Sequence, residues 1–170
     1  MFEELVHIGI DLARERNVAA LSKRTLEHAR RLTRAEAAIL SLRERDHLRM
    51  VLVDRDIIAA SLDRPASLDR PEMRADPAAE PISVHTRSAP AYVAATGIVL
   101  NIRDARAGDP PRSFPAVGVE INTALVVPLK NRTSEVIGTL TLLNAKGADG
   151  RTVPFDAGCL HWLSMPLRML

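Results

Sequence analysis

The chain has 170 residues, a length typical of one domain built around a single hydrophobic core. Its 23 lysine and arginine residues nearly balance its 21 aspartate and glutamate residues, giving a formal net charge of +2. The basic residues are scattered beside acidic ones, and the aromatic residues are few: three Phe, one Tyr and one Trp. This pattern argues against a protein that binds nucleic acid, because it offers neither a basic stripe nor a base-stacking platform.

The cysteine content and the hydropathy pattern exclude two further classes. A single cysteine, Cys159, rules out an internal disulfide and a structural zinc site built from several thiolates. No apolar run approaches the length that spans a bilayer, and residues 1–4 lack the basic and apolar regions of a signal peptide. We therefore expect a cytoplasmic protein that contacts no membrane.

The first third of the chain is predicted to be regular structure. Apolar residues recur at helical spacing over residues 3–15, and a second such stripe follows over residues 18–32. The two predicted helices meet at Asn17, which is a suitable helix cap. Short strands are then predicted over residues 37–42 and 48–53, joined by a charged turn.

Residues 54–81 have a different composition. They contain four prolines and a short repeat, Ser-Leu-Asp-Arg-Pro, which begins at Ser61 and again at Ser67. Proline at this density blocks both helix continuation and central strands. The segment is therefore predicted to be one long loop.

Strands and helices are predicted again after this loop. In chain order they are a strand over 81–85, a helix over 88–96, strands over 100–102, 124–130 and 136–143, and a helix over 155–170. Gly97 suits the end of the short helix, and Pro90 suits its first turn. Helices at both ends with strands between them indicate an α+β domain around an antiparallel sheet.

Four segments, taken in order, resemble the GAF domain family. They are Tyr-Val-Ala-Ala-Thr-Gly at 92–97, Leu-Asn-Ile-Arg-Asp-Ala at 100–105, Ala-Leu-Val-Val-Pro-Leu-Lys at 124–130 and Glu-Val-Ile-Gly-Thr-Leu-Thr-Leu-Leu-Asn at 135–144. The resemblance extends over residues 3–165. It is closest to GAF domains attached to HD-GYP phosphodiesterases, nucleotide cyclases or histidine kinases in bacterial signalling proteins.

The resemblance implies a fold and a function. The fold is a GAF/PAS-like antiparallel sheet of five or six strands, with the N- and C-terminal helices on one face and a small-molecule pocket on the other. The sheet and pocket would occupy residues 35–144 of a single domain spanning 1–170. The implied function is non-catalytic sensing of an unidentified small ligand, with a signalling output domain in cis or trans. The apolar stripes of the terminal helices additionally predict a homodimer joined through these helices. The implied pocket-lining residues are Ile39, Asp54, His85, Tyr92, Asn101, Val117, Ile121 and Thr141.

Cyclic nucleotides are disfavoured as the ligand. GAF domains that bind them carry an Asn-Lys pair, then Phe, then an acidic pair. Here Asn144, Lys146 and Phe155 approximate the first part, but Cys159 and Leu160 occupy the acidic positions. Apolar residues also replace the polar side chains that such domains place around the nucleotide, and an apolar lining cannot offset the desolvation of a phosphate.

Cofactor and enzyme chemistry are disfavoured as well. Bilin attachment in this family uses Cys followed directly by His, whereas Leu160 separates Cys159 from His161. The family's methionine sulfoxide reductases cycle a catalytic thiol against resolving thiols, which a single cysteine cannot do within one chain. His85 could ligate haem iron, but a lone histidine is more often structural or exposed.

Two functional interpretations follow from these exclusions. The first is a regulatory module that binds a small molecule and catalyses nothing. The alternative is a protein-interaction or dimerisation module with a degenerate pocket that binds no ligand. Asp104 is expected to brace the loop that follows it by accepting backbone N–H bonds.

Overall fold

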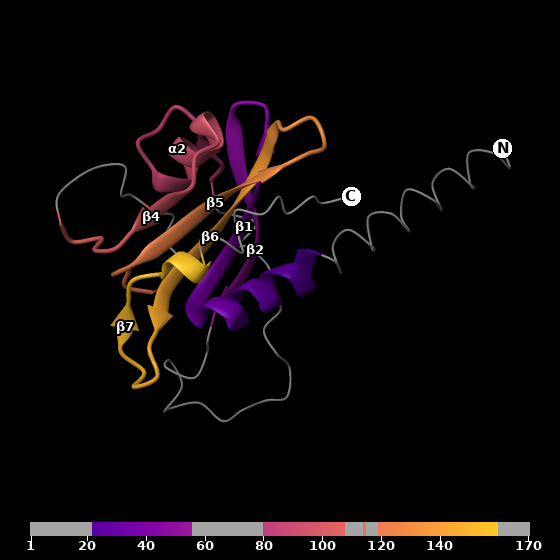
Figure 1. Cartoon of the computed structure of the whole chain (residues 1–170). Coiled ribbons are helices and arrows are strands. Elements are labelled where there is room, and N and C mark those ends of the chain that lie inside the picture. Colours follow the sequence, from indigo (N-terminus) through magenta and orange to yellow (C-terminus); the bar gives the residue numbers. More distant parts are fainter. Residues whose placement is uncertain (1–21, 56–79, 108–113, 115–118, 160–170) are drawn as a thin grey trace, which may run out of the picture.

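The computed structural model describes residues 22–55, 80–107, 114 and 119–159. The strands among them are β1 (Ala35–Glu44), β2 (His47–Arg55), β3 (Ile82–Ser83), β4 (Leu100–Ile102), β5 (Ala124–Lys130), β6 (Val136–Lys146) and β7 (Thr152–Val153), and helix α2 (Ala89–Thr96) lies between β3 and β4. In this part of the chain they form one antiparallel sheet in the order β3–β2–β1–β6–β5–β4, with the short β7 paired to β6 (Figure 1). The predicted α+β fold is therefore confirmed.

The predicted elements agree with the structure in type and differ mainly at their ends. β1 and β6 are longer than predicted because their pairing continues beyond the apolar runs: Ala35 pairs with Ala145, and Glu44 pairs with His47. The two-residue strand β7 was not predicted. The predicted helix over 3–15, most of the predicted loop over 54–81 and most of the predicted terminal helix lie outside the described residues.

The helix of residues 22–33, called the N-terminal helix below, covers one face of the sheet (Figure 1). Leu26 and Ala29 are buried in a core cluster with strand residues such as Leu140 and Leu142. Phe155 and the half-buried Cys159 pack into the same cluster. The segments at both ends of the described chain therefore share one face, as the resemblance implied.

Helix α2 covers the opposite face. Ala89 and Val93 are buried in a second cluster with residues of β1, β4, β5 and β6. Ser88 caps the helix by accepting a hydrogen bond from the backbone N–H of Ala91. Gly97 ends it at a φ of 68°, and its N–H donates to the carbonyl of Val93 at 2.8 Å.

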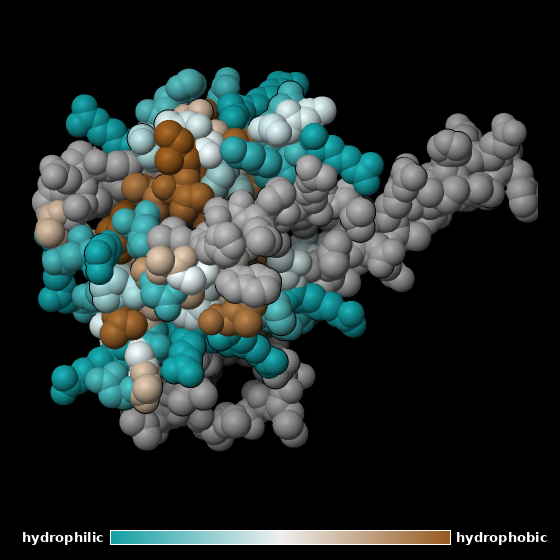
Figure 2. Space-filling view, viewed as in Figure 1, coloured by the Kyte–Doolittle hydropathy of each residue, from teal (hydrophilic) through white to brown (hydrophobic). Residues whose placement is uncertain are grey.

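The surface in this view is mainly hydrophilic, with apolar residues gathered near α2 and β4 (Figure 2). Ile98, in the connection between these two elements, is 58% exposed. No helix in the described ranges is long and apolar enough to cross a membrane.

Candidate functional site

The register of the strands aligns a row of side chains across the face that α2 covers. From β2 to β4 the row runs Val53, Ile39, Thr141, Val126 and Leu100, each paired with the next. Its aliphatic members belong to the core cluster beneath α2. Thr141 is thus a polar residue at the centre of an apolar layer.

Two hydroxyl groups on this face are buried without a hydrogen-bond partner. Thr139 and Thr141 are 0% and 1% exposed, and within the described part of the chain neither Oγ1 atom has a partner. Both lie on β6 two residues apart, so both project to the same face. Ser41, which pairs with Thr139, is also buried. Burying a hydroxyl unpaired costs about 1–3 kcal/mol. These two hydroxyls are therefore the candidate hydrogen-bonding groups for a ligand in this layer.

The loop between β4 and β5 (residues 103–123) lies beside this layer, and several contacts join its two ends. The Ala105 N–H donates to the carbonyl of Asn122 at 2.7 Å, and Arg106 forms an ion pair with Glu120. The Asp104 carboxylate accepts a hydrogen bond from the Arg106 N–H at 2.8 Å, which confirms the predicted bracing role.

Asn144 fastens the end of this loop to β6. Its Oδ1 accepts the backbone N–H groups of Asn122 and Thr123 at 2.8 and 3.2 Å. Its Nδ2 donates to the carbonyl of Glu120 at 2.7 Å and to the Glu36 carboxylate at 2.9 Å. All four hydrogen-bonding positions of the amide are therefore used.

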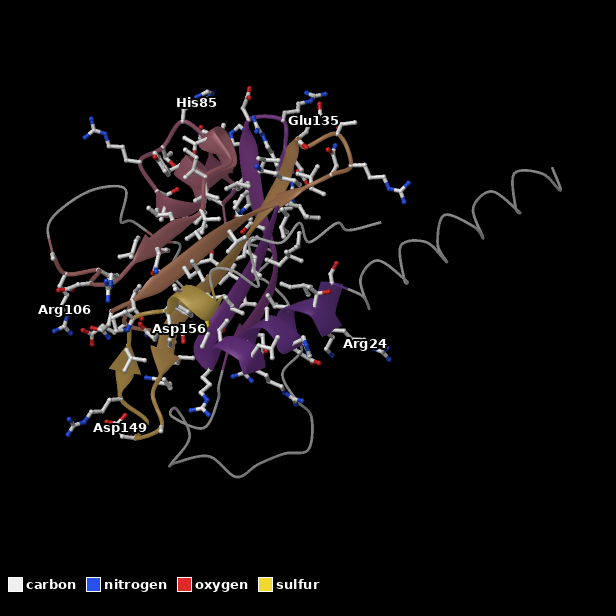
Figure 3. All side chains as sticks on the ribbon, in the orientation of Figure 1. Arg24, His85, Arg106, Glu135, Asp149 and Asp156 are labelled. Atoms are coloured by element: carbon white, nitrogen blue, oxygen red, sulfur yellow. The ribbon has the colours of Figure 1, made fainter. Side chains whose placement is uncertain are left out.

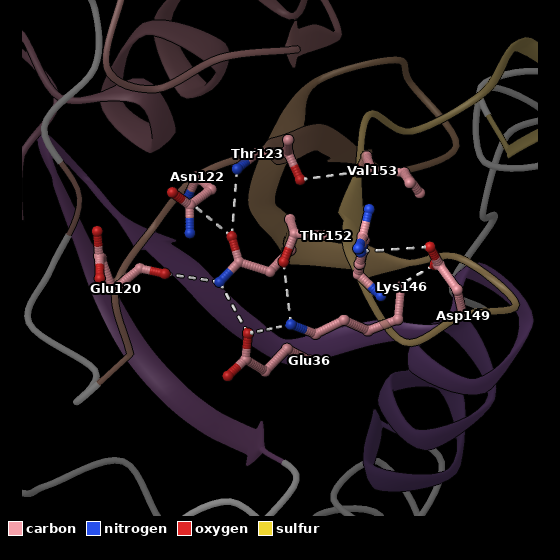
Figure 4. Close-up of polar contacts among 10 residues, drawn as sticks. Glu36, Glu120, Asn122, Thr123, Lys146, Asp149, Thr152 and Val153 are labelled. Carbon is pink, nitrogen blue, oxygen red and sulfur yellow. Dashed lines mark hydrogen bonds and ion pairs between the residues drawn. The ribbon is translucent and has the colours of Figure 1, made fainter.

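Glu36 supplies the acidic partner that the sequence lacks after Phe155. Its carboxylate lies 3.2 Å from the Lys146 ammonium group, which also donates to Thr152 Oγ1 at 3.0 Å (Figure 4). Asn144 therefore forms a hydrogen bond, and Lys146 an ion pair, with the carboxylate of Glu36 on β1, which is distant in the sequence. The network joins the start of β1, the end of β6 and β7.

The structure brings three of the residues implied by the resemblance together on the α2 face. Ile39 and Thr141 are adjacent in the row across the sheet, and Ile121 packs against the same core cluster. Val117 lies outside the described residues. Phe114 and Val119, which were not anticipated, also pack against this cluster.

Two of the implied residues project to the opposite face. Asp54 pairs with Ala38, a member of the cluster under the N-terminal helix, and its carboxylate accepts from Arg30 Nε at 2.7 Å. Asn101 donates from Nδ2 to the carbonyl of Phe155 at 3.2 Å. Strand alternation explains both placements, because each is one residue away from a position on the α2 face.

The remaining two implied residues are exposed. Tyr92 lies on α2, but its neighbour Val93 faces the sheet, and Tyr92 itself is 38% exposed. His85 is exposed, and Figure 3 shows it at the end of the molecule that carries Glu135, away from Arg106 and Asp156. Neither side chain joins the apolar row.

Thr139 is the buried polar residue that the sequence reading missed. The signal was present in β6, where Gly-Thr-Leu-Thr-Leu-Leu places two threonines on one face of an otherwise apolar strand. Alternation alone cannot tell which face those threonines occupy. The structure resolves this by placing Leu140 and Leu142 under the N-terminal helix.

The single cysteine lies away from this layer. Cys159 packs against the cluster under the N-terminal helix, and burial, followed by the nearby Asp156 carboxylate, raises the pKa of its thiol above the usual 9.0. A thiol with a raised pKa is a poor nucleophile at neutral pH. Among the described residues, no group of three or more His, Cys, Asp or Glu side chains could hold a metal ion.

Comparison with protein families now identifies the class of protein. The profile of the family described as GAF domain matches residues 17–168. The chain belongs to the GAF domain family. No curated protein matches the chain closely enough to count as a relative.

Solved structures share this fold at low sequence identity. A type II free methionine-R-sulfoxide reductase from Thermoplasma acidophilum has a TM-score of 0.58 and 11% identity, over 85% of this chain and 83% of that one. The GAF domain of an Acinetobacter phosphoenolpyruvate-protein phosphotransferase has 0.56 and 13%, over 82% and 70%. The GAF-B domain of DevS from Mycobacterium smegmatis has 0.51 and 20%, over 81% and 77%. At these identities the likeness concerns the fold alone.

Proposed function

We propose that this chain is a non-catalytic regulatory domain that binds a small molecule between α2 and the sheet. The observation that carries the proposal is the pair of buried hydroxyls on Thr139 and Thr141, which lack partners in the described part of the chain. A ligand with one or two hydrogen-bonding groups and an apolar body fits this environment. It would satisfy the hydroxyls while replacing the apolar contacts that α2 makes now.

The cysteine supports a non-catalytic function. The free methionine sulfoxide reductases of this family cycle a catalytic thiol against resolving thiols, whereas this chain has one cysteine. Cys159 lies under the N-terminal helix, on the other side of the sheet from Thr141, and its pKa is raised. These features favour a binding domain over an enzyme.

Ligand binding would be passed to the N-terminal helix through the network around Asn144. Asn144 holds the loop that borders the binding layer and also binds Glu36, only three residues after the helix ends at residue 33. The Arg30–Asp54 ion pair fixes the same helix to β2. A ligand shifts such an arrangement only if it binds one of two helix positions more tightly than the other.

We also propose a cytoplasmic homodimer that controls an output domain in cis or in trans. Leu32 lies on the N-terminal helix and is 63% exposed, although Leu26 and Ala29 on the same helix are buried. A single exposed leucine is ordinary, so the dimer proposal rests on the apolar stripes that the sequence places along the terminal helices. Light scattering coupled to size exclusion tests this, and a monomer at tens of micromolar concentration would refute the dimer.

Thermal unfolding with defined compounds tests the binding proposal. The compounds are cyclic AMP, cyclic GMP, haemin, free methionine sulfoxide and acetate. A ligand that binds the folded state should raise Tm with the logarithm of its concentration. If none does so, and a reducing system consumes no methionine sulfoxide, the degenerate-pocket alternative replaces the proposal.

The alternative has its own supporting observation. Thr139 and Thr141 are almost completely buried, so the layer between α2 and the sheet is closed at these residues. A closed layer is what an interaction module without a ligand would have. Replacement of both threonines by valine separates these functions, because only a ligand site would lose its Tm response.

A further inference from the structure

A groove of about 600 Å³ lies at the end of α2, apart from the layer that contains Thr141. The residues that line it include Arg43 and Arg45 near the β1–β2 turn, Gly97 after α2, and Lys130, Ser134 and Glu135 at the β5–β6 hairpin. In Figure 3, Glu135 lies at the top of the molecule, away from Arg106 and Asp156. The groove is therefore a separate candidate site.

The groove carries an excess of positive charge. Arg43, Arg45 and Lys130 line it together with one carboxylate, that of Glu135. The Glu135 carboxylate accepts hydrogen bonds from its own hairpin: Asn131 Nδ2 donates to it at 2.8 Å and Thr133 Oγ1 at 3.0 Å. In the described ranges neither Arg45 nor Lys130 forms an ion pair, so the cations of the groove are not neutralised there.

Arg43 is held in place by backbone carbonyl groups. Its Nε donates to the carbonyl of Arg45 at 3.0 Å, and its Nη1 donates to the carbonyl of Ala94 in α2 at 3.1 Å. A guanidinium group has five N–H donors, so three remain for a ligand. A fixed guanidinium loses less conformational entropy when it binds an anion than a mobile one does.

The end of α2 does not oppose an anion as strongly as a bare helix terminus would. The carbonyl of Ala94 accepts from Arg43, that of Val93 accepts from the Gly97 N–H, and that of Tyr92 accepts from Thr96 Oγ1. The partial negative charge of these carbonyls is thus directed into hydrogen bonds.

Gly97 leaves space at the wall of the groove. A Cβ atom added there would lie 3.4 Å from both Cε and Nζ of Lys130, and the φ of 68° already disfavours side chains. The lysine ammonium group therefore lies against a residue without a side chain. That arrangement keeps it close to the groove surface.

We propose that this groove binds a small oxyanion that carries two or more negative charges on phosphate or carboxylate groups. Three cations around one concave surface match such a ligand, and Arg43 can donate two parallel hydrogen bonds to one of its groups. A ligand bound there would contact the β1–β2 turn, the end of α2 and the β5–β6 hairpin at the same time.

Isothermal titration of the full chain with pyrophosphate and with citrate tests this proposal. Lys130→Met and Arg43→Gln should each weaken binding at least about tenfold at low ionic strength. Arg24→Gln removes the same charge from the exposed face of the N-terminal helix and should leave binding unchanged. Tighter binding of pyrophosphate would assign a phosphate ligand, and tighter binding of citrate would assign a carboxylate ligand.

Nuclear magnetic resonance provides a readout that does not depend on the variants. Pyrophosphate or citrate should shift the amide signals of Gly97 and Ser134 in the wild-type chain. Equal weakening by Arg24→Gln, or unchanged binding in both groove variants, would overturn the proposal. So would binding of a hexaglutamate peptide when both small anions fail, because the groove would then be a protein-docking surface.

Discussion

At the scale of single residues, Asn144 has an unusual combination of strain and hydrogen bonding. Its backbone φ is 53°, in the left-handed region, and its buried amide uses every donor and acceptor. Asparagine tolerates this backbone better than other residues that carry a side chain. The conformation aims the amide at a loop and at β1 simultaneously.

Replacement of Asn144 should separate these two contributions. Asn144→Ala removes four hydrogen bonds and retains the backbone strain, so the free energy of unfolding should fall by about 3 kcal/mol. Asn144→Gly removes the same bonds but relieves the strain, so it should be less harmful by about 1 kcal/mol. Urea unfolding measures both. Equal stability of the two variants would show that the backbone is not strained.

The reactivity of Cys159 is a second prediction at this scale. Because burial raises the pKa of the thiol, iodoacetamide should alkylate the folded chain at pH 8 more slowly than it alkylates free cysteine. The neighbouring carboxylate contributes to this pKa, so Asp156→Asn should lower it and speed alkylation. The rate measured across a pH series gives the pKa directly. A pKa below 9.0 in the wild-type chain would contradict this account and favour thiol catalysis.

At the scale of elements, β1 and β6 approach each other too closely at one point for any side chain. A Cβ atom on Gly138 would lie 2.3 Å from the backbone carbonyl oxygen of Ser41, beside the register shift between Leu40 and Ser41. Such contacts are not relieved without moving the strands. Gly138 thus fixes the spacing between β1 and β6, and β6 is the strand that carries Thr139 and Thr141.

Gly138→Ala should therefore cost about 2–4 kcal/mol of unfolding free energy. Gly150→Ala is the matched control, because a Cβ there has no atom within 4 Å and only its φ of 77° is unfavourable. The control should cost about 1 kcal/mol. Urea unfolding of both variants distinguishes them. If Gly138→Ala is as mild as the control, the close approach is not a constraint.

The sequence predicts elements better than it predicts faces. Periodicity and capping residues located α2 between Ser88 and Gly97 because those signals are local. Pro128 in β5 did not break the strand, since β4 pairs only with residues 124–126 and leaves Pro128 beside an open edge. Asp54 and Asn101 were expected on the α2 face, yet they bind Arg30 and Phe155 on the other, because a shift of one residue reverses a strand's faces.

The network around Glu36 could not be predicted from sequence for another reason. Glu36 and Asn144 are separated by 108 positions, and only the pairing of β1 with β6 brings them together. The same holds for the groove, whose cations come from two separate hairpins. Contacts between distant segments depend on how the strands pair, and no local sequence signal reveals which distant residues will be paired.

At the scale of the whole molecule, the sheet separates two layers with different properties. The layer under the N-terminal helix contains an apolar cluster, an ion pair that fixes the helix, and one buried oxygen without a partner among the described residues, Oδ1 of Asn101. The layer under α2 contains hydroxyls that cost stability without local compensation. Stability sacrificed at one site is characteristic of a site kept for function.

Thermal unfolding of a Thr139→Val/Thr141→Val double variant tests this account most directly. Valine keeps the shape and removes both unpaired hydroxyls, so the ligand-free variant should gain about 2 kcal/mol, or roughly 4–8 °C in Tm. Thr123→Val is the control, because its hydroxyl donates to the Val153 carbonyl at 3.2 Å, and it should lower Tm.

The decisive comparison adds whichever of the five compounds raises the Tm of the wild-type chain most. The double variant should have the higher Tm alone and lose the rise with the compound, while Thr123→Val should keep that rise. A double variant that retains the full rise, or a wild-type chain that responds to none of the compounds, would contradict a small-molecule site between α2 and the sheet.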